Sequence, residues 1–368
     1  MQIGYRLRAA RRAAGYTLER VARETGIGAS SLSEFENDKR EPRFSQLSRL
    51  AEVYKRSIEF FLKERAPAET VMLWRDAPAD PDEVRNVESR FRQLCEQYHR
   101  LESLMAQPEE VIWLQAATAR DRFDFKEAGR LAEKFRKEYL QGDIPSASLK
   151  QVLEERLRVK VFHLRFHGSA VSTVSAEFGP AVLLNSGSRL WRRNFDLAHE
   201  LFHLLTWEVF RTPDSDMCEP NSEEDQLADA FASRLLLPTD AVKDRIEQLA
   251  DEEGKIGLET LDEIAREFGV SLPALLWRMK YLYNQSVEEI RQHIEQAERL
   301  RINRPPRASD KPDELPERYC SLAIRALNEG KLSLIQFARY MGLGYKKAQE
   351  YLVDEGDRTD EEVSISVA

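Results

Sequence analysis

Two histidines in the middle of the chain have the spacing of paired metal ligands. His199 and His203 stand four residues apart in the run Asn194-Phe-Asp-Leu-Ala-His-Glu-Leu-Phe-His-Leu-Leu205. Positions i and i+4 share one face of a helix, so both imidazoles can bind one Zn²⁺ while Glu200 faces the open coordination position. The pattern therefore predicts a zinc site with a carboxylate placed as general base.

The apolar surroundings of the motif strengthen this interpretation. Nonpolar side chains cover nearly every side of the expected helix, namely Leu197, Ala198, Leu201, Phe202, Leu204 and Leu205. The helix should therefore be buried. Two buried imidazoles and a buried carboxylate are costly without a cation, and a bound metal ion removes that cost.

A third protein ligand should come from the helix expected over residues 223–238. The inner side of that helix would carry Ala228, Phe231, Ala232 and Leu235. Asp225 precedes Ala228 by three residues and Glu224 precedes it by four, so both continue the same side. Geometry alone does not choose between these two carboxylates.

Residues 127–282 resemble the ImmA/IrrE family of metallopeptidases. The resemblance rests on Leu184-Asn185, on the segment from Arg193 to His203, on the segment from Asp225 to Pro238, and on a tail from Phe268 to Arg278. It implies a zincin-like domain with Zn²⁺ held by His199, His203 and Asp225. Asp225 replaces the family's usual glutamate and Phe202 stands where glycine is usual, and Glu224 stays the alternative ligand.

The chemistry implied by this resemblance is metal-assisted peptide hydrolysis. Zinc lowers the pKa of a water ligand towards about 7 and polarises the scissile carbonyl. Glu200 would take the proton of the water and pass it to the leaving amine. The strand expected at 181–184 is a candidate to bind substrate as an added strand through a free edge. Cys218 is either a thiolate that caps the zinc in a latent form or a bystander.

The first 65 residues form a basic segment at the head of an acidic chain. They contain 14 Lys/Arg and 9 Asp/Glu, whereas the whole chain has a net charge of −9. Four or five short amphipathic helices are expected here. Thr17 is a plausible N-cap and Gly26 a plausible C-terminal stop, and Gly26-Ile27-Gly28 would turn into a helix beginning near Ala29. This is the spacing of a helix-turn-helix.

The segment resembles the Cro/Xre-type repressor domains. The matching residues are Arg6, Arg11, Gly15, Thr17-Leu18, Val21-Ala22, Gly26-Ile27, Ser31-Leu32-Ser33, Glu36-Asn37 and Lys39-Arg40-x-Pro42. In that family the second helix lies in the major groove of double-stranded DNA. The resemblance implies base contacts by Ala29, Ser30, Ser33 and Glu34, and phosphate contacts by Asn37, Lys39, Arg40 and Arg43. The alternative is a small helical domain with a solvated basic face.

A heptad pattern follows the head. Pro67 and the run from Ala77 to Pro81 end the head, and a long helix should start near Asp82. Its apolar positions alternate at spacings of three and four: Val84, Val87, Phe91, Leu94, Tyr98, Leu101 and Met105. Such a stripe favours a parallel coiled coil and hence a homodimer reading a paired operator. The alternative is that the stripe packs on the chain's own body.

The elements together predict an α+β fold that is predominantly helical. We expect a helix-turn-helix bundle at 1–66, a linker with the heptad helix at 67–125, a zincin-like body with a small sheet at 126–285, and a helical C-terminal region at 286–368. The body should contain helices at 127–139 and 146–157 and strands at 159–166, 170–175 and 181–184. In the tail, 333–342 and 345–351 look like a degenerate second helix-turn-helix, expected to serve packing, and the end from Glu355 should be disordered.

Composition limits the function further. Three widely spaced cysteines are no disulfide framework, the chain opens without a basic-then-apolar leader, and no stretch approaches the roughly 18 apolar residues of a membrane span. A cytoplasmic protein is expected. The first functional hypothesis is a DNA-binding regulator with a zinc endopeptidase that cleaves a repressor or itself, switching a stress, phage or mobile-element response. The second is a catalytically silent regulator whose peptidase-like body senses a ligand or partner.

Overall fold

The fold is predominantly helical with one small sheet, which confirms the α+β class. The computed structural model describes residues 3–56, 58–62, 71–106, 123–211, 222–300, 302 and 311–351. Three predictions fall outside these residues: the boundary at Pro67, the role of Cys218 and the disorder from Glu355. Within the described ranges, no helix combines the length and apolar character needed to cross a membrane.

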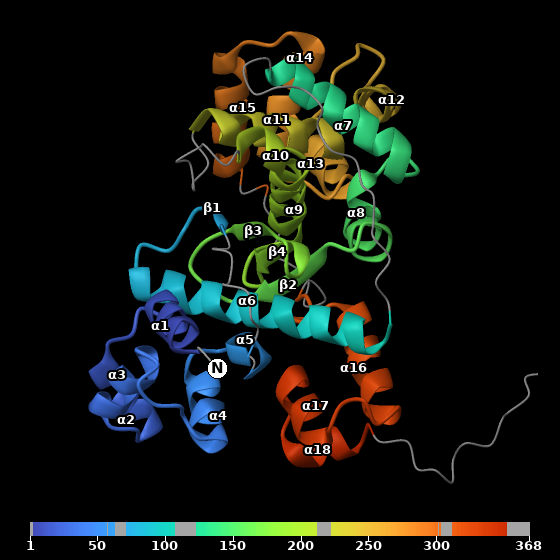
Figure 1. Ribbon diagram of the computed structural model, residues 1–368. Helices are drawn as coiled ribbons and strands as arrows, with labels where there is room; N and C mark the ends of the chain where they lie inside the picture. The colour runs from blue at the N-terminus through green and yellow to red at the C-terminus, as the bar shows by residue number, and fades with distance from the viewer. Residues whose placement is uncertain are drawn as a thin grey trace, which may run out of the picture.

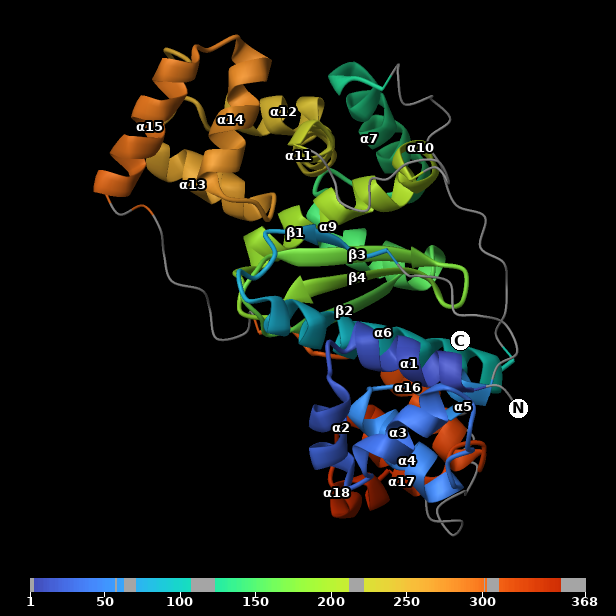
Figure 2. The same cartoon turned by 60° about the vertical axis from the view of Figure 1, so that its left-hand side comes forward.

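The elements are stacked in layers around the sheet (Figure 1). Helix α9 (Leu190–Leu205) covers one face of the sheet, and α6 (Pro81–Leu104) covers the other. Beyond α9 lie α7 (Phe125–Tyr139), α10 (Trp207–Phe210), α11 (Ser222–Leu236), α12 (Thr239–Leu249), α13 (Leu258–Glu267), α14 (Leu272–Tyr283) and α15 (Val287–Arg299). The helices between residues 4 and 62 and those between residues 317 and 349 lie on the side of α6 that faces away from the sheet, as Figure 2 shows from a second side.

The head forms five short helices, in agreement with the four or five expected from the sequence. They are α1 (Gly4–Ala13), α2 (Leu18–Thr25), α3 (Ala29–Glu36), α4 (Phe44–Val53) and α5 (Ile58–Leu62). The Thr17 hydroxyl accepts a hydrogen bond from the backbone N–H of Arg20 at 3.2 Å, and Gly26 ends α2 in the left-handed conformation with φ of 69°. Both capping predictions are confirmed, as is the helix start at Ala29.

The sheet has the strand order β1-β3-β4-β2. Its strands are β1 (Leu73–Arg75), β2 (Lys160–Leu164), β3 (Ala170–Ser175) and β4 (Gly179–Asn185). Strand β3 pairs antiparallel with β1 and β4, and β2 pairs parallel with β4. The prediction of a free edge at 181–184 is wrong, because β4 is paired on both sides. Strand β1 comes from the segment expected to be a linker.

The helix expected at 146–157 is divided into three short pieces. They are η2 (Pro145–Ala147), α8 (Leu149–Gln151) and η3 (Val152–Arg156), the last a π-type turn. The backbone N–H of Leu157 bonds to the Val152 carbonyl at 3.1 Å, an i to i+5 bond. Leu149, Leu153 and Leu157, which are spaced four residues apart, are all buried.

The heptad stripe packs against the chain itself, so its interpretation as a coiled-coil seam is wrong. Phe91, Leu94 and Leu101 are fully buried, and Tyr98 is 1% exposed. The stripe shares a core with Phe162, Val171, Ala181 and Leu183 of the sheet and with Tyr319, Leu322 and Ala323 of α16 (Glu317–Asn328). Because the sheet and α16 cover the stripe, a second chain has no access to it, and a homodimer would need another surface.

This burial predicts that Leu94→Ala acts on folding and leaves the oligomeric state unchanged. The cavity left by the leucine should lower the free energy of unfolding by about 3 kcal/mol. Urea unfolding and analytical ultracentrifugation of the same sample measure both effects, with Asn86→Ala on the exposed side of α6 as the control. A variant of unchanged stability that sediments as a smaller species would restore the coiled-coil interpretation.

Candidate metal centre and nucleic-acid surface

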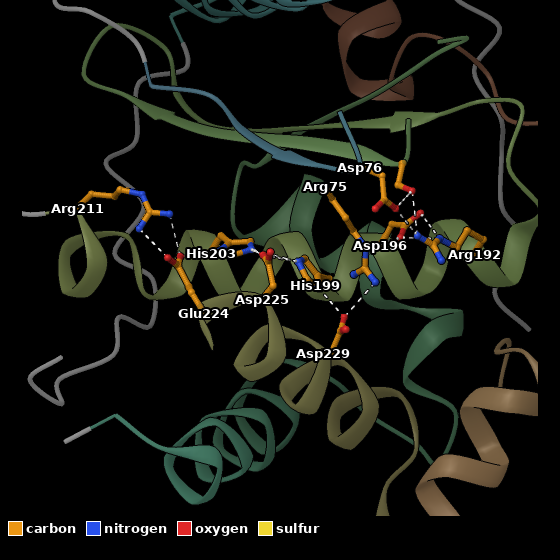
Figure 3. A network of polar contacts seen from close by, with 11 residues as sticks. Arg75, Asp76, Arg192, Asp196, His199, His203, Arg211, Glu224, Asp225 and Asp229 are labelled. Atoms are coloured by element: carbon orange, nitrogen blue, oxygen red, sulfur yellow. Dashed lines mark hydrogen bonds and ion pairs between the residues drawn. The ribbon is translucent and has the colours of Figure 1, made fainter. Parts of the chain in front are cut away.

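Helices α9 and α11 bring the two histidines and Asp225 together (Figure 3). The Nε2 atoms of His199 and His203 lie 3.2 Å apart, and the Asp225 Oδ1 lies 3.7 Å from each of them. A tetrahedral zinc ion with bonds of about 2.1 Å separates its ligand atoms by roughly 3.4 Å. The three donor atoms therefore fit around one such ion. The side chains of His199 and His203 are 3% and 2% exposed, whereas that of Asp225 is 46% exposed, so the site opens on the side of Asp225.

Two further carboxylates hold the imidazole rings from behind. The Nδ1 of His199 lies 2.8 Å from the Asp229 Oδ1, and the Nδ1 of His203 lies 2.9 Å from the Glu224 Oε1. A carboxylate at Nδ1 favours the tautomer with the proton on Nδ1, which leaves the Nε2 lone pair free for a metal. Of the two candidate third ligands, Glu224 thus faces the Nδ1 atom of His203, whereas Asp225 faces the Nε2 atoms of both rings.

Charge at the buried Glu224 is stabilised by its contacts with Arg211 and His203. Arg211 donates two hydrogen bonds to its carboxylate, at 3.0 and 2.9 Å. Burial by itself would raise the pKa of Glu224, but the contacts with His203 and Arg211 outweigh it and lower the pKa. At His199, burial likewise opposes a larger effect, because hydrogen bonds to Asp225 and Asp229 raise the pKa of the ring.

Glu200 lies between the two histidines and is buried without a partner. Its residue is 1% exposed, and neither carboxylate oxygen has a hydrogen-bond partner among the described residues. An unpaired buried carboxylate is costly, so both oxygens need a donor that the described residues do not supply. A water molecule held at the neighbouring metal position would be such a donor.

A chain of ion pairs that the sequence did not reveal extends the site to β1 (Figure 3). Arg75 lies 3.0 Å from Asp229 and 3.3 Å from Asp196, and Arg192 pairs with Asp196 at 3.0 Å and with Asp76 at 2.9 Å. Burial raises the pKa of Asp196 to about 6, against the lowering influence of the two arginines. Asp196 precedes His199 by three residues, a spacing that could have marked it, but nothing in the local sequence points to Arg75.

The predicted DNA-contacting residues lie on α3 and on the turn that follows it. Ser30, Asn37, Lys39, Arg40 and Arg43 are exposed, and Ala29, Ser33 and Glu34 are half-buried. Several of these side chains already have partners within the head. The Arg40 guanidinium lies 3.8 Å from the Glu34 carboxylate, and the Asn37 amide donates to the Ser33 carbonyl at 2.7 Å and accepts from Arg8.

An ion pair fixes α3 against α1. Arg11 donates to both carboxylate oxygens of the buried Glu36, at 2.6 and 2.8 Å. Such a bidentate pair constrains direction as well as distance. The orientation of α3 therefore depends on two residues that belong to the helix-turn-helix resemblance, and Arg11 and Glu36 have a structural role.

Comparison with known families agrees with both halves of this architecture. Residues 154–280 match the family model described as "IrrE N-terminal-like domain", and residues 7–61 match the model described as "Helix-turn-helix". The chain joins a Cro/Xre-type helix-turn-helix domain to an IrrE-like peptidase domain. Both resemblances are confirmed.

One curated relative matches a stretch of 62 residues. The HTH-type transcriptional regulator ImmR of Bacillus subtilis (strain 168) is 39% identical over 62 residues, which are 17% of this chain and 49% of that protein. The chain thus spans about half the length of this relative. No solved structure matches the chain.

The IrrE-like domain is extended in this protein by a segment outside the matched residues. The match begins at residue 154, whereas β1 and its Arg75 lie between the two matched regions. Even so, β1 completes the sheet, and Arg75 contacts the carboxylate behind His199. The segment that follows the DNA-binding head is therefore part of the surroundings of the candidate metal centre.

The buried Asp196 predicts strong coupling with Arg75. Arg75→Ala should lower the free energy of unfolding by about 3 kcal/mol, because it removes one partner of a fully buried carboxylate. In an Asp196→Asn background the same change should cost about 2 kcal/mol less, as a double-mutant cycle by urea unfolding with chelator present can measure. Arg165→Ala, at an exposed arginine, is the control. Equal costs in both backgrounds would contradict the pairing.

Proposed function

We propose that this protein is a DNA-binding transcriptional regulator whose IrrE-like domain is a zinc-dependent endopeptidase. The substrate would be a repressor, either a partner protein or this chain itself, and its cleavage would switch a stress, phage or mobile-element response. The observation that carries the proposal is the convergence of His199, His203 and Asp225 on one point beside the unpaired Glu200.

The residues of α9 and α11 have separate roles in this proposal. His199, His203 and Asp225 would hold the zinc ion, which when bound supplies a Lewis acid for the scissile carbonyl and for the attacking water. Glu200 would accept the proton of that water and donate it to the leaving amine. Asp229 and Glu224 are positioning residues, because each fixes the ring whose Nε2 it leaves free.

The head supplies the DNA-binding half of the proposal. Ala29, Ser30, Ser33 and Glu34 would face base edges of a double-stranded operator, and Asn37, Lys39, Arg40 and Arg43 would contact phosphates. The relative ImmR, named as a transcriptional regulator, supports a regulatory role for this head. The candidate metal ligands lie on α9 and α11 and the candidate DNA-contacting residues lie on α3 and the turn after it, so the two functions belong to different surfaces.

The geometry predicts different losses for the two neighbouring carboxylates of α11. Asp225→Ala should remove a ligand and abolish stoichiometric zinc, whereas Glu224→Gln should weaken zinc binding about 10- to 100-fold, because it acts through His203. Elemental analysis and competition with a chelator measure both variants. Glu223→Gln, at the exposed neighbour, is the matched control. Full zinc content in Asp225→Ala, with loss in Glu224→Gln, would assign the ligand to Glu224.

Cleavage should depend on Glu200. Glu200→Gln should keep zinc and fold normally yet reduce peptide hydrolysis by about 10²- to 10⁴-fold, the usual contribution of a general base. New protein N-termini are sequenced in cells that express wild type, Glu200→Gln or the exposed control Glu138→Gln. The substrate is the protein whose new N-terminus is missing from the Glu200→Gln cells and present in the other two.

The same experiment separates the proposal from a catalytically silent regulator. Identical N-termini in all three strains, together with unchanged regulation of the operator by Glu200→Gln, would show that the peptidase-like body acts without hydrolysis. Loss of regulation in that variant, with its zinc retained, is the result expected for a regulatory protease.

A further inference from the structure

The C-terminal region repeats the helix-turn-helix of the head 316 positions later in the chain. Residues 17–35 and 333–351 share identical residues at Leu18/Leu334, Ala22/Ala338, Arg23/Arg339, Gly26/Gly342, Gly28/Gly344 and Glu34/Glu350. The cap residue carries a hydroxyl group in both segments, Thr17 in the head and Ser333 in the C-terminal region. The turn is Gly-Ile-Gly in the head and Gly-Leu-Gly in the C-terminal region. Gly26/Gly342 and Gly28/Gly344 lie in the turn and Ala22/Ala338 lies on the inner side, whereas Arg23 and Arg339 are exposed in both segments. The cap and the turn are the positions that determine such a motif.

The cap, the first helix and the turn are built in the same way in both segments, whereas the second helix has five residues in the C-terminal segment and eight in the head. The Ser333 hydroxyl caps α17 (Leu334–Met341) by accepting from the N–H of Gln336, as Thr17 accepts from Arg20. Gly342 ends α17 with φ of 64°, close to the 69° of Gly26. After the turn, α18 (Tyr345–Gln349) begins with a bond from the Ala348 N–H to the Gly344 carbonyl at 3.0 Å, as α3 does between Leu32 and Gly28.

The two cores differ by exchanges that conserve volume. Phe337 and Ala348 stand where the head has Val21 and Leu32, and all four side chains are buried. The same exchange occurs one helix earlier, where Tyr319 and Ala323 replace Ile3 and Leu7. A larger residue in one position is offset by an alanine in its neighbour, and cores tolerate such swaps best. The tail therefore preserves the packing of the motif with different residues.

The outer face of the second motif is exposed and basic. Tyr345, Lys346 and Lys347 occupy the positions of Ala29, Ser30 and Ser31, and all three are exposed. Arg339 and Gln349 are exposed beside them. Residues 311–351 contain seven Lys/Arg and five Asp/Glu in a chain whose net charge is −9. The buried face of the region is covered by α6 and α16, so packing accounts for the inner face but leaves the basic one unexplained.

We infer that residues 333–351 form a second helix-turn-helix that contacts double-stranded DNA. Lys346 and Lys347 bind backbone phosphates, and Tyr345 lies at the first position of the helix that enters the groove. The motif and the head both lie on the side of α6 that faces away from the sheet (Figure 1; Figure 2). A single chain thereby carries two DNA-contacting surfaces, and this inference requires no activity at the metal centre.

The test measures the salt dependence of DNA binding by the full-length chain. Fluorescence anisotropy with a labelled 40-base-pair duplex of arbitrary sequence gives the slope of log Kd against log salt concentration. Each phosphate contact contributes about 0.9 to that slope, so Lys346→Gln/Lys347→Gln should reduce it by about 1.8 and weaken binding by roughly 60-fold near 0.1 M salt. Lys346→Arg/Lys347→Arg should retain the slope of the wild type.

A charge-matched control separates a site from general electrostatics. Lys134→Gln/Lys137→Gln removes two exposed lysines of α7, on the opposite side of the sheet, and should leave the slope unchanged. The measurement is repeated in an Arg40→Ala/Arg43→Ala background, in which the phosphate contacts expected of the head are removed. Binding that persists there and is lost on further change of Lys346 and Lys347 supports the second motif whether or not the head behaves as proposed.

Two outcomes would overturn the inference. One is an unchanged slope for Lys346→Gln/Lys347→Gln in protein with the urea midpoint of the wild type. The other is an equal reduction of the slope in the α7 control, which would mean that any two lysines contribute alike.

Discussion

Helix α9 is buried although one of its faces carries polar side chains, and the arrangement of the elements around it depends on this constraint. Asp196, His199, Glu200 and His203 are all 2% exposed or less, and each needs a partner in a region that excludes water. Helix α11 supplies Asp229 and Glu224 to the two rings, and β1 supplies Arg75 to Asp196. The packing of α11, the sheet and the N-terminal segment around α9 thus supplies partners to three of these four groups. Glu200 alone is left without a partner in the described part of the chain.

Segments far apart in sequence are joined around α6. Its apolar side carries the sheet and α16, while Arg56 of the head forms an ion pair with Glu96 at 2.5 Å. The first motif, the sheet and the second motif therefore share one supporting helix. A shift of α6 would therefore displace both helix-turn-helix motifs and the sheet, because closely packed interiors have low compressibility and transmit strain.

Features governed by local chemistry could be predicted from the sequence. Thr17 and Gly26 define the ends of α2 because a cap hydroxyl and a left-handed glycine act within a few residues, and His199 and His203 share a face because helical periodicity is fixed. The heptad stripe could not be assigned, since a helix covered by its own sheet and a helix in a coiled coil show the same apolar period. Arg75 was missed because its role depends on pairing between β1 and β3. Asp225 and Glu224 differ by only one position, and their opposite roles become visible only when α11 is placed against α9.

The lengths of the two antiparallel ladders of β3 differ, and this difference sets the order in which the sheet opens. Strand β1 pairs with β3 over three residues, whereas β4 pairs with it over six. Short edge ladders open with little free energy, so amides shared with β1 should exchange with solvent well before those shared with β4. Each such opening also withdraws Arg75 from Asp229 and Asp196. The charges around α9 therefore depend on the shorter of the two antiparallel ladders of β3. That ladder is formed by β1, which lies in the segment that follows the head.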